Sequence, residues 1–337
     1  MAINRVLYSS QLVTVTTASG GPKTWVLPFQ TASVDTTIPT EDVLVLGKLG
    51  GVGREQKDVA TCKASLKAFI CENITLAAPV VGSGNPTYTA AALGNIHTFL
   101  LALKADSLAG TAISVTCGYD HTPNPSEPAG GENVGGFIFA GACSNISIDA
   151  AKGAFPTLDL SFDGVGEVSY MALGGSSAGR EEHAGHNYIE LANPVTSDQV
   201  SVVNASATTD SLNSAKFAFD MPTETVSRLG GIIKGNTTTV IGDNVMFSKP
   251  PFKSTLTVEG ISMTTLGTTV PTSLAITSLN PAVGNAAATV KASFNATISS
   301  AAAVTARSQN NNVGDVGATF SMTVEGTDAT FTGTLAP

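Results

Sequence analysis

Alternating apolar and polar positions dominate this chain, and a period of two residues is typical of β-strands. The alternation predicts strands at residues 11–16, 24–29, 60–75, 111–119 and 136–143. One segment instead has a helical period, because Leu93, Ile96, Leu100 and Leu103 recur at steps of three and four. The pattern therefore predicts a mainly β fold with one α-helix at about residues 88–104.

Several sequence blocks occur twice along the chain. Residues 39–47 read PTEDVLVLG, and residues 222–230 read PTETVSRLG, 183 residues later. Three further pairs match in the same order: residues 63–70 with 253–261, 144–148 with 294–298, and 160–164 with 322–326. Self-similarity at this spacing indicates one β unit used twice. We therefore expect two tandem domains, residues 1–175 and 176–337.

Glycine- and proline-rich stretches interrupt the strand pattern and mark loops. They lie at residues 47–58, 120–135 and 173–185. We interpret the last of these as the stretch between the two domains. The second half has no helix as clear as the first, and a Thr-, Pro- and Ala-rich region at residues 264–288 takes its place.

Length and composition agree with two β domains in an assembly. A prior of roughly 150 residues per domain gives two domains for 337 residues. Charged residues make up 13% of the chain, against roughly 25% in an ordinary soluble protein. Much of the polar surface therefore comes from Ser, Thr, Asn and Gly, which suit strands and turns. Burial in an assembly would reduce the number of charges that the surface needs.

Net charge and the first residues exclude several classes of protein. The formal charge is −9 and no basic run occurs, so we expect no tight binding to a phosphate backbone. Residues 1–6 lack the apolar core of a signal peptide. No apolar run approaches the roughly 18 residues of a membrane span. We therefore expect a soluble protein made in a cytoplasm, with no membrane partner.

Few residues carry the chemistry of a site. Residues 181–186 read EEHAGH and combine two histidines with two carboxylates, which are ligand types of transition metals. Their glycine-rich surroundings favour a solvated loop instead. Residues 47–54 are rich in glycine but lack the GK[ST] ending of a phosphate-binding loop. No nucleophile elbow occurs, so we assign no catalytic, cofactor-binding or metal-binding residue and expect neither an enzyme nor a cofactor.

The four cysteines permit three disulfide pairings. If Cys62 and Cys71 share one extended strand, their Cα atoms lie roughly 30 Å apart, beyond the reach of a disulfide. Cys117 and Cys143 flank the loop at residues 120–135 and are candidates to face each other across a hairpin. Assembly in a cytoplasm favours free, buried thiols, and oxidation in a released particle is the alternative.

The order of the blocks resembles that of phage major tail tube proteins. The resemblance is carried by residues 137–148, FIFAGACSNISI, and 155–164, FPTLDLSFDG. In these segments a strand, a short polar link and a second strand ending in glycine follow one another. The resemblance extends to residues 41–49 and, in the second half, to 290–326, so that it touches most of the chain.

This resemblance implies that each half is a tail-tube-type β-sandwich or half-barrel. In that family six copies of the domain form a ring, and the rings stack into the hollow inner tube of the tail. Two domains per chain would let three chains supply six domains to each ring, which would have a sixfold outline and threefold detail. The protein would then belong to the virion tail and would assemble in the host cytoplasm.

The same resemblance implies the partners. They are further copies of the chain in homotrimeric rings, the tape-measure protein inside the tube, and the tail terminator and distal tail proteins at its ends. Phage DNA would pass through without sequence-specific binding. An acidic lumen would repel its phosphates and favour sliding over adsorption.

Other functions remain alternatives. A secreted or surface adhesin-like β-sandwich protein also fits the Thr-, Ser-, Ala- and Gly-rich composition, although residues 1–6 do not resemble a signal peptide. A virion decoration or baseplate component would share the domain without open-ended stacking. An enzyme fits least, because carbohydrate-active β-sandwiches display aromatic platforms, whereas aromatic residues are 6% of this chain, with one Trp.

Overall fold

The structure is a computed structural model of the chain. It describes residues 11–44, 51–56, 59–76, 88–120, 134–166, 168–171, 189–195, 199–203, 212–226, 245–260, 270–280, 289–310 and 319–335. Most of these residues lie in strands and the described part holds a single helix, which confirms the predicted mainly β fold. Within the described ranges, no helix has the length and apolar character that crossing a membrane requires.

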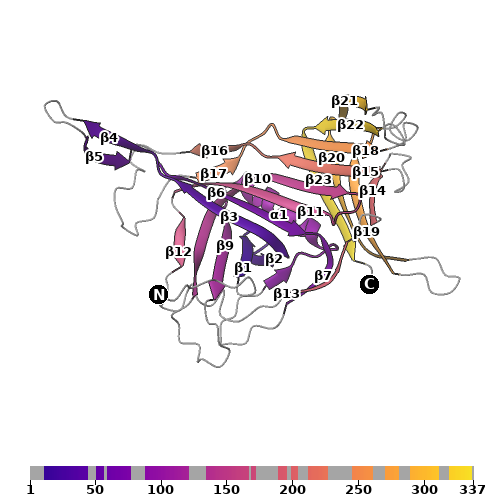
Figure 1. Ribbon diagram of the computed structural model, residues 1–337, viewed down its shortest axis with the longest axis horizontal. Helices are drawn as coiled ribbons and strands as arrows, with labels where there is room; N and C mark the ends of the chain where they lie inside the picture. Colours follow the sequence, from indigo (N-terminus) through magenta and orange to yellow (C-terminus); the bar gives the residue numbers. More distant parts are fainter. Residues whose placement is uncertain are drawn as a thin grey trace, which may run out of the picture.

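Thirteen strands form one branched sheet, because the long strand β10 (Val134–Ala151) belongs to two branches. The first branch, the eight-stranded sheet, has the order β3 (Phe29–Thr37), β6 (Thr61–Phe69), β11 (Thr157–Val165), β10, β15 (Leu212–Asp220), β18 (Lys253–Gly260), β22 (Thr319–Gly326) and β21 (Ala303–Asn310). It runs through both halves of the sequence, and its strands span the molecule in Figure 1.

Two further sheets lie beside the eight-stranded sheet. The second branch, the six-stranded sheet, has the order β8 (Tyr88–Ala90), β2 (Lys23–Val26), β1 (Gln11–Thr17), β9 (Ile113–Asp120), β10 and β12 (Ser169–Met171). A separate four-stranded sheet has the order β14 (Val200–Val203), β19 (Ser273–Asn280), β20 (Thr289–Ser300) and β23 (Asp328–Leu335).

Three strand pairs complete the described strands. They are β4 (Thr40–Leu44) with β5 (Gly51–Gln56), β16 (Thr223–Val226) with β17 (Val245–Ser248), and β7 (Cys71–Leu76) with β13 (Ile189–Pro194). Both copies of the repeated PTE motif enter such a pair, directly after β3 and β15, and β4·β5 reaches furthest out at the left of Figure 1. The loop predicted at residues 47–58 is wrong for residues 51–56, because these glycine-rich residues pair with β4.

Each half of the chain packs two sheets face to face. In the first half, the rings of Phe139 in β10 and Phe162 in β11 lie 6.1 Å apart. In the second half, Phe331 in β23 lies 6.1 Å from Phe217 and 6.3 Å from Phe219, both in β15. One hydrophobic core runs through both halves, and burying each such ring stabilises the fold by about 1.5–3 kcal/mol.

The helix α1 (Ile96–Ala109) lies against sheets of both halves. On one side, the ring of Phe99 is 5.4 Å from that of Trp25 in β2. On the other side, Lys104 donates hydrogen bonds to Asp328 Oδ1 at 2.6 Å and to the carbonyl oxygen of Ala329 at 3.0 Å, both in β23. The helix therefore bridges the six-stranded and four-stranded sheets.

The helix begins later than the predicted range of 88–104. Residues 88–90 pair in parallel with β2 and are extended, so the helix cannot start there. It ends at Gly110, whose φ of 68° lies in the left-handed region that favours glycine. Ile96, Leu100 and Leu103 face the core as their spacing predicted, and Leu93 is buried in the turn before the helix. The predicted start signal at residues 85–87 lies outside the described residues.

The pairing order of the strands repeats between the two halves. The series β3-β6-β11-β10 in the first half has the same connectivity as β15-β18-β22-β21 in the second. The series β1-β9-β10-β12 likewise corresponds to β14-β19-β20-β23. The single strand β10 thus has two counterparts, β20 in the smaller sheet and β21 in the eight-stranded sheet.

The strand registers repeat as well. Three residues lie side by side across β3, β6 and β11: Thr36, Cys62 and Gly164. The equivalent three lie across β15, β18 and β22: Phe219, Ser254 and Gly326. Phe219 follows Thr36 by 183 residues, which is also the offset of the PTE motif. Register and motif therefore define the same correspondence between β3 and β15.

For two of the blocks that matched in sequence, the strand registers give a different counterpart in the other half. The counterpart of Lys63 is Thr255, two residues beyond Lys253 with which it was matched. The block at residues 144–148 lies in the part of β10 that corresponds to β21, whereas its sequence match at 294–298 lies in β20. In both cases the alternation of similar residues aligns equally well at a neighbouring register.

Two glycines mark the places where a strand passes from one sheet to the other. A Cβ atom on Gly164 would lie 2.4 Å from the carbonyl oxygen of Ala140 in β10. A Cβ atom on Gly326 would lie 2.5 Å from the carbonyl oxygen of Ser300, at the end of β20. The matched blocks at residues 160–164 and 322–326 both end in an acidic residue followed by glycine. The close approach of the crossing backbone explains the glycine of these acid-glycine ends.

Replacing either glycine with alanine should destabilise the fold. We expect Gly164→Ala and Gly326→Ala each to lower the free energy of unfolding by about 1–3 kcal/mol, because overpacking forces backbone shifts. Urea denaturation followed by circular dichroism measures this. Gly53→Ala is the matched control, since a Cβ there meets no atom within 4 Å. A Gly164→Ala variant as stable as that control would contradict the crossing argument.

Candidate functional site

The EEHAGH segment and part of the glycine-rich segment fall outside the part of the chain that the structure describes. Residues 181–186 lie outside the described residues, as do 47–50 of the glycine-rich stretch. Residues 51–54 belong to β5, where Arg54 forms an exposed ion pair with Asp42 at 2.9 Å. Among the described residues, no group of three His, Cys, Asp or Glu side chains is placed to hold a metal ion.

All four cysteines are free thiols. Cys117 lies opposite Phe137 in the β9·β10 pair, so the hairpin does not bring it to face Cys143. Burial raises the pKa of Cys62, Cys71 and Cys117 to about 11, with a further contribution at Cys62 from the nearby negative charge of Asp163. Burial also raises the pKa of Cys143. These thiols are therefore protonated and poor nucleophiles at neutral pH.

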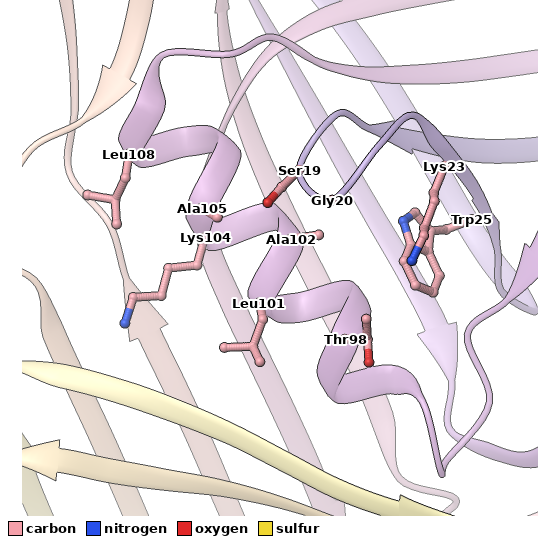
Figure 2. Close-up of a pocket in the computed structure, with 10 residues that line it drawn as sticks. All are labelled: Ser19, Gly20, Lys23, Trp25, Thr98, Leu101, Ala102, Lys104, Ala105 and Leu108. Atoms are coloured by element: carbon pink, nitrogen blue, oxygen red, sulfur yellow. The ribbon is translucent and has the colours of Figure 1, made fainter.

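A hollow of about 480 Å³ runs along α1 beside the turn between β1 and β2 (Figure 2). Leu101 and Leu108 line it and are 39% and 42% exposed. The ammonium group of Lys23 lies 5.8 Å over the ring of Trp25, and Figure 2 shows this pair across the hollow from the helix. Its described lining offers apolar surface and lysine side chains, with no carboxylate, imidazole or thiol.

The candidate functional surface in the described part is one face of the eight-stranded sheet, which we call the polar face. A row of directly opposed residues crosses all eight strands: Thr31, Lys67, Asp159, Ser147, Ala218, Thr255, Glu325 and Ala303. Each member is polar or small. The neighbouring row points into the core, where Leu66, Leu160 and Ile146 are at most 1% exposed. The sheet thus separates a buried apolar face from a continuous polar one.

The polar face carries more carboxylates than lysines. Seven carboxylates lie on it: Asp35, Asp149, Asp159, Asp163, Asp220, Glu259 and Glu325. Four lysines lie on it: Lys63, Lys67, Lys216 and Lys253. This surplus of negative charge extends over strands from both halves of the chain.

Every lysine of the polar face has a carboxylate beside it. Lys67 is 3.6 Å from Asp159, and Lys253 is 3.0 Å from Glu325. Lys63 lies opposite both Asp35 and Asp163, and Lys216 lies opposite Asp149. Such exposed pairs add little stability, but they leave no lysine isolated as a binding point for a phosphate.

The sheet ends in two strands that have a neighbour on one side only. Among the described strands, β3 pairs with β6 alone and β21 pairs with β22 alone. Most side chains of both strands are exposed. An unpaired strand edge is a template for pairing with another chain. This face and its edges were not predicted, although the polar residue at every second position of residues 61–67 carries the signal.

A buried carboxylate connects the two halves beside this sheet. Glu72 in β7 is 8% exposed. It accepts hydrogen bonds from the hydroxyl of Ser278 in β19 and, at 3.0 Å, from the ammonium group of Lys291 in β20. Burial by itself would raise the pKa of Glu72, but these hydrogen bonds and the lysine charge outweigh it and hold the pKa below its ordinary value. The ionised form is therefore the one that the folded chain prefers.

Removing this charge should weaken the fold in a pH-dependent way. Because folding lowers the pKa of Glu72, its contribution is present above the unfolded pKa and is lost as the pH falls through the folded one. We expect Glu72→Gln to lower the free energy of unfolding at pH 7 by about 1–3 kcal/mol, and the difference from wild type to shrink below about pH 4. Urea titrations at several pH values measure this.

An exposed ion pair supplies the control for that experiment. Glu224 pairs with Lys249 at 2.5 Å on the β16·β17 hairpin, and both side chains are about half exposed. Glu224→Gln should change the stability by less than about 1 kcal/mol. Equal effects of the two substitutions would show that Glu72 does not join the halves.

Comparison with known protein families found no family model that matches the sequence, and comparison with curated proteins found no match. The features of this chain that bear on its function are therefore the polar face, its edges and the repeated strand order.

Proposed function

We propose that this chain is a structural subunit of a phage tail tube, which assembles into stacked rings around a conduit for DNA. The observation that carries the proposal is the eight-stranded sheet. Two copies of one strand series are joined edge to edge in it, with a polar face that is continuous across the joint and a strand edge at each end. Such a sheet can be extended by further copies and can close into a wall without edges.

The two faces of the sheet suit the two sides of a tube wall. The apolar face is already covered by the six-stranded and four-stranded sheets and by α1. The polar face is left for an aqueous lumen. Its surplus of carboxylates, with a carboxylate beside each lysine, would repel the phosphates of passing DNA and give them no binding point.

The partners follow from this role. Further copies of the chain would complete each ring, three chains supplying six sandwiches. A tape-measure protein would fill the lumen before ejection, and tail terminator and distal tail proteins would close the ends. The subunit would assemble in the host cytoplasm and end in the tail of the virion, and the proposal requires no catalytic step.

Electron microscopy of the purified protein tests the proposal directly. We expect negative-stain images of concentrated protein to show hollow rings or tubes with a sixfold outline. Analytical ultracentrifugation should then give assemblies in multiples of three chains. A chain that stays monomeric at high concentration would contradict the proposal and would favour the adhesin-like alternative. Single closed rings that never stack would favour a decoration or baseplate component.

A charge series on the polar face tests its role as a lumen wall. Asp159→Lys with Glu325→Lys removes two carboxylates and leaves Lys67 and Lys253 without their ion-pair partners. We expect tubes of this variant to retain double-stranded DNA in a salt-dependent manner, and wild-type tubes to release it. The neutral variant Asp159→Asn with Glu325→Gln should lie between them. Equal retention by all three would place the polar face outside the lumen.

A further inference from the structure

We propose that β21 of one copy of this chain pairs antiparallel with β3 of a second copy, in the register that β10 and β15 already adopt within the chain. The repeated strand order carries this inference. Within one chain, β10 pairs with β15 and joins the first half to the second. The counterparts of these strands are β21 and β3, which are the two ends of the eight-stranded sheet. The contact inside the chain is therefore a template for the contact between chains.

The register of β10 with β15 can be applied to β21 and β3, because each of these two strands has a defined counterpart in the internal junction. A β-bulge interrupts β10 between Cys143 and Asn145, and another interrupts β21 between Val304 and Ala306. Aligning the bulges sets Ser308 of β21 at the place of Ser147 in β10. The 183-residue offset between β3 and β15 sets Asp35 at the place of Ala218.

The transfer gives a specific register. Within the chain, Ser147 lies opposite Ala218, and Ile146 lies opposite Phe219. Between chains, Ser308 should therefore lie opposite Asp35 of the second copy, on the polar face. The next pair, Arg307 and Thr36 of the second copy, should point to the core side.

This register is electrostatically compatible. The row on the polar face would read Ser321, Ser308, then Asp35, Lys63 and Asp163 of the second copy. In this row the carboxylate of Asp35 has Ser308 of the first copy on one side and Lys63 of its own chain on the other. No like charges oppose each other across the new junction, which would be destabilising.

The junction between chains differs from its template in polarity. Inside the chain, the core-facing pair is Ile146 and Phe219, both fully buried. Between chains, the corresponding pair is Arg307 and Thr36. The first junction thus gains hydrophobic burial and is permanent, whereas the second depends on backbone hydrogen bonds and polar contacts. A chain with polar edges can fold and stay dispersed before it associates.

The two junctions also differ in what lies beside them. Residues 70–112, between β6 and β9, include α1, which packs on β23 across the internal junction. The equivalent stretch of the second half, residues 261–272, is too short for a 14-residue helix and its turns. Around a ring, the β10·β15 junction within each chain must therefore alternate with the β21·β3 junction between chains. That a ring holds three chains rests on the proposed function; the β21·β3 register does not.

Site-directed cross-linking tests the register. In the variant with Ser308→Cys and Asp35→Cys, a short thiol-specific cross-linker should join neighbouring chains, because directly opposed Cβ atoms lie about 4.5–5.5 Å apart. We expect denaturing gels to show dimers and trimers, with no larger species. Cys62, Cys71 and Cys143 are buried and Cys117 is partly buried, so the wild-type chain should give no ladder.

Two variants bracket this result. Asp149→Cys with Lys216→Cys joins two accessible, directly opposed residues of the internal junction on the polar face and should cross-link within the chain, changing its mobility without raising its mass. Ser308→Cys with Thr36→Cys differs from the test variant by one residue but puts the thiols on opposite faces, so it should cross-link at least tenfold less. Urea midpoints close to that of wild type would show that each variant is folded.

A charge pair gives an independent measurement. Ser308→Asp would set a carboxylate opposite Asp35 and should weaken self-association about tenfold or more. Ser308→Lys would set an ammonium group there and should not weaken it. Sedimentation equilibrium measures both. Equal association of the two variants would overturn the register.

The outcomes separate this proposal from the proposed function. If microscopy shows tubes but the variant with Ser308→Cys and Asp35→Cys gives no cross-links between chains, the proposed register is wrong and the proposed tube function still stands. Cross-linked closed trimers that never stack would support the junction and contradict the tube. A ladder that continues to six chains would support the register and contradict three chains per ring.

Discussion

The pairing of β10 with β15 is the contact on which the rest of this architecture depends. It joins the last strand of one sandwich to the first strand of the next, so that two four-stranded segments become one sheet. Because Ile146 and Phe219 are fully buried at this joint, the two sandwiches share a core and cannot swing freely. The continuity of the polar face is a direct consequence.

Two further contacts hold the sandwiches at a defined angle. Lys104 of α1 reaches Asp328 and the carbonyl oxygen of Ala329, and its ammonium group lies 5.4 Å over the ring of Phe219. Glu72 of β7 likewise contacts the second half, because it accepts hydrogen bonds from Ser278 and Lys291. Both connections run from the first half to the second, and both are partly or largely buried. The two halves are therefore joined by side chains behind the sheet as well as by the pairing of β10 with β15.

Features encoded by local chemistry were predictable from the sequence. The PTE motif and the acid-glycine ends reflect a hairpin entry and a close backbone approach, which constrain residue types at single positions. Long-range pairing was not predictable in the same way. The helix start was placed too early because β8 is extended only through its pairing with β2. The block at residues 144–148 was aligned with β20 because nothing in an alternating strand tells which of two sheets it joins.

The polar face shows the same division between local and long-range information. The alternation within β6 and β11 indicates one solvent-facing and one core-facing side for each strand. Eight such strands, from both halves, align their solvent-facing sides. Three of their pairings, β6 with β11, β10 with β15 and β18 with β22, join residues more than 50 positions apart, such as Ser147 with Ala218. From composition alone, only the negative sign of the chain's net charge could be predicted.

Among the described residues α1 lies in the first half alone, and this has a consequence for the outer surface of an assembly. In a ring of three such chains, the helices would form three ridges spaced 120° apart, with a plainer sector between each pair. A component that grips the ring from outside would meet three equivalent orientations in place of six. Successive rings would likewise have three equivalent ways to stack, so the twist of a tube could be read from the path of its ridges.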